Sequence, residues 1–382
     1  MAKFVSFCMT LLLIFSSQIP TFAAEIQPPV VKSEAAVVLD SQTGAVIYAK
    51  NANERMYPAS LTKIATAIYA IEKGNLDDIV TVSANAVKAE GTRVYLLEGE
   101  KVPLRKLLQG MLINSGNDAA IAVAEHLDGS VQQFAMHLNT YLKTKIGVTN
   151  TNFTNPNGLF DENHYTSAMD LALITNYAMK NPVFAQIFGT KELKWNGEGW
   201  NTTLITHHRM LKGEIPYPGI TGGKTGYVDQ SKQTLATTAE NGKIKLTVIE
   251  LKGNNKKDIY DDTIHLLDYG FHNYQNEILP KSVQYNVGKK EFILSKDTLI
   301  TVPLNGLVKQ VNSQGELSIK NSNGQQIQTI QLILKTKPGI EKEHKSIVNQ
   351  TTHLNAFYGV AIFIIAGAIL SLRNQFLKRS KA

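Results

Sequence analysis

Cysteine is nearly absent from this sequence of 382 residues. The one cysteine, Cys8, lies in an apolar stretch near the N-terminus that we expect to be removed by cleavage. A mature chain without thiols can form no disulfide, use no cysteine nucleophile and bind no Cys-ligated zinc. The chemistry of this protein must therefore come from other side chains.

The signatures of two common kinds of enzyme site are also missing. No HExxH motif and no cluster of carboxylates and histidines at ligand spacing occurs, so the sequence predicts neither a metal centre nor a cofactor. The pair His207-His208 comes nearest, and we interpret it as solvated or packed. No Gly-x-Ser-x-Gly elbow occurs, and none of the nine histidines stands in a recognisable catalytic setting. A serine nucleophile would need another base.

Strong charge is confined to the ends of the chain. The net charge is +7, but five cations lie at the two termini: Lys3, Arg373, Lys378, Arg379 and Lys381. The rest has a net charge of only +2, with no basic stripe among aromatics, so we expect no nucleic-acid partner. Glycine and proline are near average and no long period repeats, which excludes solenoids, propellers and collagen-like folds.

The long apolar runs also lie at the two ends. Residues 1–24 join a positive start, an apolar core and small residues, which is typical of a signal peptide. Residues 357–372 are nearly all apolar and precede the basic tail 373–382, which predicts one transmembrane helix with a cytoplasmic tail. Residues 338–356 are mostly polar and suit a linker.

These two segments predict the same location for the protein. We expect a single-pass protein of the cell membrane, attached by its C-terminal helix, whose other domains lie outside the cytoplasm. The alternative is a helix that lies on the membrane surface, but residues 357–372 lack the charged face that such a helix needs.

The exported part divides into two regions. Over residues 25–272, strand-like and helix-like pieces alternate, beginning with a hairpin at 35–48 and helical patterns at 61–74, 104–112 and 119–127. Residues 273–337 contain short strand-like pieces separated by Gly, Asn and Ser turns, which predicts a small all-β domain. The sequence thus predicts an α/β domain followed by a β-sandwich.

Three short motifs suggest a serine site. Ser60 and Lys63 lie three residues apart at a helix start, so they share a face, and a lysine of depressed pKa can take the serine proton. Lys224-Thr225-Gly226 suits a strand edge that binds a carboxylate by charge and hydroxyl. Ser115-Gly116-Asn117 occupies a loop between helices, although Ser83-Ala84-Asn85 has the same pattern.

Each motif has an ordinary interpretation when it is taken alone. Ser60 could be a helix cap beside an exposed lysine, and Lys224 a surface residue of a strand. However, Ser60 is the only serine with a lysine three positions later, and the three motifs follow one another in the order Ser-x-x-Lys, Ser-x-Asn, Lys-Thr-Gly. That combination resembles the penicillin-recognising serine acyltransferases.

Within that group the chain resembles the low-molecular-mass penicillin-binding proteins that are serine-type D-alanyl-D-alanine carboxypeptidases. The resemblance extends from about Ala35 to Phe271 through the segments PASLTKIATA, LINSGNDAAIAVAEHL, TNFTNPNGLF, HYTSAMDLALI, GGKTGY and LLDYGF. It implies an α/β catalytic domain of the penicillin-binding and β-lactamase-like type, a small β-sandwich and a C-terminal membrane attachment. It implies peptidoglycan stem peptides as substrates and β-lactams as inhibitors.

The resemblance also implies a role for each motif residue. Ser60 is the acyl-ester nucleophile, Lys63 the general base and Ser115 a proton relay. Asn117 contacts the substrate amide, Lys224 and Thr225 of the Lys-Thr-Gly motif hold the terminal carboxylate, and the backbone N–H groups of Ser60 and Tyr227, which follows Gly226, form the oxyanion hole.

Two departures from the family pattern leave alternatives open. The segment YVDQSKQT after the Lys-Thr-Gly motif lacks a common Ala-Gly pair, and Lys256 and Lys257 stand where the family often has an arginine for the carboxylate. The alternatives are a β-lactamase of the same fold, for which no additional base is evident, and a wall scaffold that binds penicillin without turnover.

Overall fold

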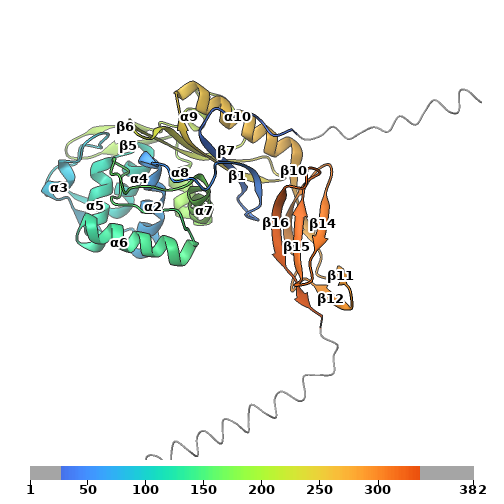
Figure 1. Cartoon of the computed structure of the whole chain (residues 1–382). Helices are drawn as coiled ribbons and strands as arrows, with labels where there is room; N and C mark the ends of the chain where they lie inside the picture. Colours follow the sequence, from blue (N-terminus) through green and yellow to red (C-terminus); the bar gives the residue numbers. More distant parts are fainter. Residues whose placement is uncertain (1–26, 336–382) are drawn as a thin grey trace, which may run out of the picture.

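The computed structural model describes residues 27–335, and its centre is an antiparallel five-stranded sheet in the order β2-β1-β9-β8-β7 (Figure 1). The sheet strands are β1 (Ala35–Asp40), β2 (Val46–Lys50), β7 (Ile220–Val228), β8 (Lys232–Glu240) and β9 (Lys245–Gly253). The N-terminal strand β1 pairs with the late strand β9, with Val37 opposite Ile249. The first and last parts of this domain therefore close one sheet.

A helical layer with α2 at its centre lies on one face of the sheet. Its helices are η1 (Ala59–Leu61), α2 (Thr62–Lys73), α3 (Ala84–Val87), α4 (Leu104–Ile113), α5 (Asn117–Asp128), α6 (Val131–Tyr141), η2 (Leu142–Ile146), α7 (Ala168–Ala178) and α8 (Pro182–Phe188). Two small hairpins, β3 (Ile79–Thr81) with β4 (Lys101–Pro103) and β5 (Glu192–Asn196) with β6 (Asn201–Ile205), complete this layer.

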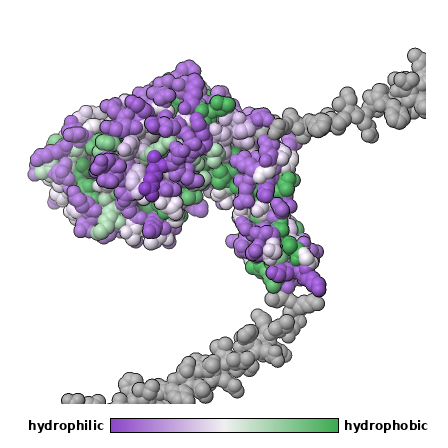
Figure 2. Space-filling view, in the orientation of Figure 1, coloured by the Kyte–Doolittle hydropathy of each residue, from purple (hydrophilic) through white to green (hydrophobic). Residues whose placement is uncertain are grey.

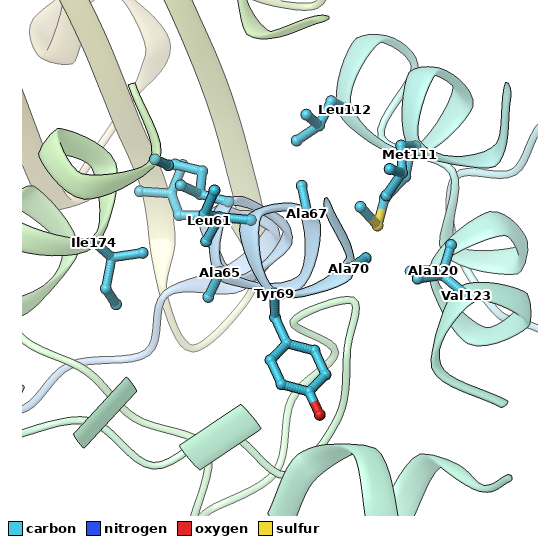
Figure 3. Packing of buried hydrophobic residues seen from close by; sticks show 14 of the residues in the cluster. Leu61, Ala65, Ala67, Tyr69, Ala70, Met111, Leu112, Ala120, Val123 and Ile174 are labelled. Atoms are coloured by element: carbon cyan, nitrogen blue, oxygen red, sulfur yellow. The ribbon is translucent and has the colours of Figure 1, made fainter. Parts of the chain in front are cut away.

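Helix α2 is the centre of the larger hydrophobic core. Its residues from Thr62 to Ala70 are all buried, and Ala65, Ala67 and Ala70 let neighbouring helices approach closely (Figure 3). Met111 of α4 and Val123 of α5 lie beside it. Polar atoms on so deeply buried a helix must find partners inside the protein, which decides the geometry of the site below.

The opposite face of the sheet is covered by α10 (Lys256–Asn273) and the short helix α9 (Arg209–Lys212). Strand alternation divides β9 between the two faces, because Ile249 and Leu251 belong to the α2 core whereas Leu246 and Val248 belong to the α10 core. The domain is thus three-layered, with the sheet between two helical layers.

The helix and hairpin predictions agree with the structure, with one shift. The pattern at 61–74 corresponds to α2, which ends before Gly74, and the pattern at 104–112 corresponds to α4. Helix α5 starts at Asn117, two residues earlier than its apolar pattern suggested. The loop that carries Ser115 is therefore shorter than expected, and Asn117 is held by a helix.

Short strands alone follow α10 up to residue 335. Their bounds are β10 (Tyr274–Leu279), β11 (Gln284–Val287), β12 (Lys290–Ile293), β13 (Thr298–Pro303), β14 (Val308–Val311), β15 (Glu316–Lys320), β16 (Gln326–Gln331) and β17 (Ile333–Leu334). They form small antiparallel sheets around a core that includes Phe292, Ile300 and Leu317. On the face drawn in Figure 2, hydrophobic residues are visible on this β domain, whose exposed apolar side chains include Ile278 and Leu334.

The two domains meet at the β1–β2 turn. The buried carboxylate of Asp40 accepts hydrogen bonds from the backbone of Gln42 and Thr43 and from the hydroxyl of Thr301 in β13, at 2.6, 3.1 and 3.0 Å. Ile327 of β16 packs into the α10 core. One charged group therefore serves both a turn of the first domain and a strand of the second.

The segments expected to export and anchor the chain lie outside the described residues. They are the signal peptide 1–24, the linker 338–356, the transmembrane helix 357–372 and the tail 373–382. Within residues 27–335, no helix has both the length and the apolar character to cross a membrane.

Candidate active site

Ser60 lies in the turn η1, immediately before helix α2. Its position places the hydroxyl at the positive end of the helix, where developing negative charge is favoured. The preceding residue, Ala59, has a φ of 48°, which is strained for a residue other than glycine. Ser115 also has a positive φ, of 64°. Strained backbone thus lies directly before Ser60 and at Ser115, which are two of the predicted functional serines.

Lys63 lies one helical turn after Ser60 and is fully buried. Its Nζ is 2.8 Å from Ser60 Oγ, 2.7 Å from Asn117 Oδ1 and 2.6 Å from the carbonyl oxygen of Asn157. Burial, and next the positive charge of Lys224, holds the pKa of Lys63 well below its usual range. In the neutral amine, two N–H groups satisfy Asn117 and Asn157, which leaves the lone pair facing Ser60.

Lys224 of β7 forms a second pair with Ser115. Its Nζ donates to Ser115 Oγ at 2.9 Å and to the carbonyl oxygen of Thr225 at 2.7 Å. Burial lowers the pKa of Lys224 to about 7. Two Lys–Ser pairs, one at the start of a helix and one between a strand and a loop, therefore lie at one site, and burial lowers the pKa of both amines.

The competing Ser-x-Asn motif lies elsewhere. Ser83 caps α3 by accepting a hydrogen bond from Ala86, and both Ser83 and Asn85 bond to Glu125. Asn117, by contrast, bonds to Lys63 through Oδ1 and to the carbonyl of Glu90 through Nδ2. The structure thus brings Ser115 and Asn117, and not Ser83 and Asn85, to Ser60.

One open cavity of about 900 Å³ lies at the predicted site residues. Ser60, Ser115, Thr225, Gly226 and Tyr227 line it, while Lys63, Asn117 and Lys224 lie buried behind them. A Cβ on Gly226 would be 2.9 Å from the backbone nitrogen of Ser60 and 2.4 Å from Thr234 Oγ1. Glycine is therefore needed where β7 meets the turn of Ser60.

Three cations and one carboxylate from α9, α10 and the segment after α9 also line the cavity, and the carboxylate, Glu214, pairs with Arg209 and Lys212. The cations are Arg209 and Lys212 of α9 and Lys256 in the first turn of α10. Lys257, the other lysine considered from the sequence, is exposed and paired with Asp261. Because Lys224 is buried and engaged with Ser115, and Arg209 and Lys212 pair with Glu214, Lys256 is the lining cation without a salt bridge among the described residues.

Sequence reasoning gave no role to the loop that carries Asn157. The carbonyl of Asn157 fixes Lys63, and Gly158, with a φ of 85°, approaches Ala59 so closely that a Cβ would lie 1.9 Å from its carbonyl oxygen. The Asn-Gly dipeptide was the available signal for this turn. The contact of this carbonyl with Lys63 could not be predicted from residue types, because every residue has a backbone carbonyl.

The pair His207-His208 has separate surroundings. His208 caps α9 through the backbone of Leu211 and bonds Thr237, and burial lowers its pKa to about 3. His207 lines the cavity, and its pKa is lowered to about 4 by burial and then by Lys224. Both imidazoles are neutral near pH 7, and His208 is a packed residue, one of the two interpretations offered from the sequence.

A family model described as D-alanyl-D-alanine carboxypeptidase, peptidase family S11, matches residues 22–255. The chain belongs to this family. It is 31% identical over 355 residues to D-alanyl-D-alanine carboxypeptidase DacF of Bacillus subtilis, which covers 86% of this chain and 90% of the relative. The alignment with this chain thus spans nearly the whole length of that relative.

Solved structures of the carboxypeptidase family show the same fold. Penicillin binding protein 5 from Haemophilus influenzae has a TM-score of 0.69 at 25% identity, covering 81% of this chain and 98% of that one. The D-alanyl-D-alanine carboxypeptidase DacD from Francisella tularensis has a TM-score of 0.70 at 24% identity, covering 81% and 94%. The expected penicillin-binding α/β fold is confirmed by these likenesses.

Proposed function

We propose that this chain is a serine D-alanyl-D-alanine carboxypeptidase that removes the C-terminal D-alanine from peptidoglycan stem peptides. The observation that carries the proposal is the contact of Ser60 with Lys63 inside a cavity that also receives Ser115, Thr225 and Gly226. Membership of the family and the DacF relative support the same activity.

The first step is acylation of Ser60. Neutral Lys63 takes the hydroxyl proton while Oγ forms a bond to the carbonyl carbon of the penultimate D-alanine. The side-chain oxygen of Asn117 and the carbonyl oxygen of Asn157 accept hydrogen bonds from the resulting ammonium and stabilise its charge. The buried amine of Lys63 suits this role because its pKa is held well below the usual range.

The second step is departure of D-alanine and hydrolysis. The C–N bond breaks as the leaving nitrogen takes the hydroxyl proton of Ser115, which Lys224 holds by its N–H. Ser115 is reprotonated with the proton that Lys63 took from Ser60, so Lys63 becomes neutral again. Water then adds to the acyl carbon and loses a proton to the neutral Lys63. The bond between the acyl carbon and Ser60 Oγ breaks as Lys63 returns that proton to Oγ. Both steps use an oxyanion hole formed by the N–H groups of Ser60 and Tyr227.

The substrate's two ends occupy different parts of the cavity. The peptide runs along the edge of β7, and the terminal carboxylate lies toward Thr225, with Lys256 supplying positive charge from the cavity lining. β-Lactams acylate Ser60 in the same place, as inhibitors. The proposal includes export directed by residues 1–24 and a membrane anchor at residues 357–372, so that the enzyme acts outside the cytoplasm at the cell membrane.

The test uses the full chain and a peptide that ends in D-alanyl-D-alanine. We expect release of D-alanine that Ser60→Ala abolishes, together with stable labelling of the parent by a fluorescent penicillin. Rapid turnover of penicillin without D-alanine release would instead establish the β-lactamase, and stable labelling without D-alanine release the binding scaffold.

A further inference from the structure

The peptide unit that joins Ala59 to Ser60 is held by more than its own turn. Its N–H is one of the two donors of the proposed oxyanion hole, and its C=O is the carbonyl of the strained residue Ala59. An amide rotates as a plane, so any group that fixes the carbonyl oxygen also aims the N–H. The surroundings of Ala59 O therefore bear on catalysis.

One side chain bonds to that oxygen, and a second side chain bonds to the first. The hydroxyl of Thr62 donates to Ala59 O at 2.9 Å, and Thr62 Oγ1 is 2.8 Å from Nε2 of His164. Thr154 N–H donates to Nδ1 of His164 at 3.0 Å, so the imidazole proton is on Nε2. Since Thr62 gives its only proton to Ala59 O, it must accept the proton of His164.

Burial keeps this chain of hydrogen bonds intact. Thr62 and His164 are both buried, and desolvation lowers the pKa of His164 to about 4, which keeps the ring neutral near pH 7. Phe153 stacks on the imidazole with ring centroids 5.0 Å apart. Gly158 closes over Ala59 O from the other loop. Neither side chain lines the cavity, so neither can touch substrate directly.

We propose that His164 and Thr62 are positioning residues that orient and polarise the Ala59–Ser60 peptide for the oxyanion. A carbonyl that accepts a strong hydrogen bond makes its own N–H a better donor, because hydrogen bonds in series strengthen one another. The inference rests on the proposed oxyanion hole. It assigns the segment around His164 a part in catalysis, beyond its contribution to packing.

The test compares Thr62→Val, which keeps the shape but removes the hydroxyl, with Thr62→Ser, which keeps the donor. We expect Thr62→Val to slow acylation by a fluorescent penicillin and to lower kcat for D-alanine release by roughly tenfold, less than the roughly 100-fold cost of losing a whole oxyanion donor. Thr62→Ser recovers most of both rates. KM stays within about twofold, because the peptide acts on the transition state.

A spectroscopic signal separates positioning from stability. In the penicilloyl enzyme, the infrared stretch of an isotope-labelled acyl carbonyl moves to higher wavenumber in Thr62→Val, since a weaker donor polarises it less. Thr175→Val is the matched control, because it removes an equally buried hydroxyl that bonds within α7. It lowers the melting temperature comparably and leaves both rates and the carbonyl stretch unchanged.

The role of His164 is tested by a double-mutant cycle. His164→Phe keeps the stacking on Phe153 but removes the donor to Thr62. We expect it to slow acylation less than Thr62→Val does, and to add nothing in the Thr62→Val background, because it acts only through that hydroxyl. Additive losses, or an unshifted carbonyl stretch in Thr62→Val, would overturn the inference.

The outcomes also separate this inference from the proposed function. If the parent releases no D-alanine, the function fails, yet penicillin acylation and the carbonyl stretch still report on Thr62 and His164. If the parent is active and Thr62→Val acylates at the parental rate, the inference fails and the carboxypeptidase stands.

Discussion

The two faces of the central sheet bury ionisable groups in opposite ways. On the α2 face, the amine of Lys63 has three oxygens within 2.8 Å. On the α10 face, Glu250 of β9 is equally buried, yet it bonds only Thr263 through one oxygen, and the other oxygen has no partner among the described residues. The surroundings of Lys63 can stabilise the amine before and after it takes up a proton, whereas the surroundings of Glu250 favour only the neutral acid.

The two faces also give opposite dependences of stability on pH. Burial lowers the folded-state pKa of Lys63 and Lys224, so the unfolded chain binds more protons and stability rises with pH toward 10.5. Burial raises the pKa of Glu250 well above 4.5, so the folded chain binds more protons. That contribution is complete below pH 4.5 and is lost as pH rises through the folded-state pKa.

Removing the buried amine should separate activity from stability most sharply. We expect Lys63→Met to lower kcat/KM for D-alanine release by about 10³-fold, because no other base faces Ser60. The melting temperature should hold or rise, since an apolar chain of similar size replaces a buried amine. Lys73→Met, in the exposed last turn of α2, is the control and should keep full activity. A Lys63→Met enzyme with near-parental turnover would contradict the assigned base.

The two Ser-x-Asn motifs allow a matched test on the α2 face. Ser115→Ala should lower kcat by about 100-fold, because the leaving amine loses its proton donor. Ser83→Ala should cost about 1 kcal/mol of stability through loss of the α3 cap, with kcat unchanged. Kinetics and thermal melts on both variants check this, and the reverse pattern would show that the motifs have been assigned to the wrong serine.

The neighbouring lysines of α10 test where the carboxylate binds. Lys256→Ala should raise KM for a peptide with a free terminal carboxylate by about tenfold, while Lys257→Ala should change it little, because Lys257 points to solvent and pairs with Asp261. The same peptide with an amidated C-terminus should bind both variants alike. Equal effects of the two substitutions would remove Lys256 from the carboxylate site.

The smallest expected effect belongs to the α10 face. Glu250→Gln keeps the shape and removes the ionisation, so we expect it to add about 1 kcal/mol of stability near pH 8 and nothing near pH 4. Denaturant unfolding at the two pH values measures the difference. An equal change at both would show that packing, and not ionisation, dominates at this position.

Most residues of the candidate site could be located from the sequence because they lie in short local patterns. Ser60 and Lys63 are three residues apart on one helix, and Lys224 to Tyr227 are consecutive on one strand. The contact of Ser115 with Lys224, however, joins positions 109 residues apart. Only the order of the motifs suggested it, and Ser83 matched the same pattern.

The remaining features could not be predicted, for physical reasons. The partner of Lys63 in the loop is the main-chain carbonyl of Asn157, which every residue type possesses. The contact of Thr62 with His164 spans 102 residues and joins two common residue types. Strands β10, β12 and β14 are short and lie in polar sequence, so their alternation is too weak to stand out.

The carboxylate of Asp40 has a consequence for how the chain unfolds. Its hydrogen bonds divide between the β1–β2 turn and Thr301 of the β domain, and a buried charge that loses a partner becomes costly. Whichever domain opens first therefore strips the other of a satisfied contact. We therefore expect the two domains to unfold cooperatively, so the sheet that packs against the turn of Ser60 is stabilised in part by strands of the β domain.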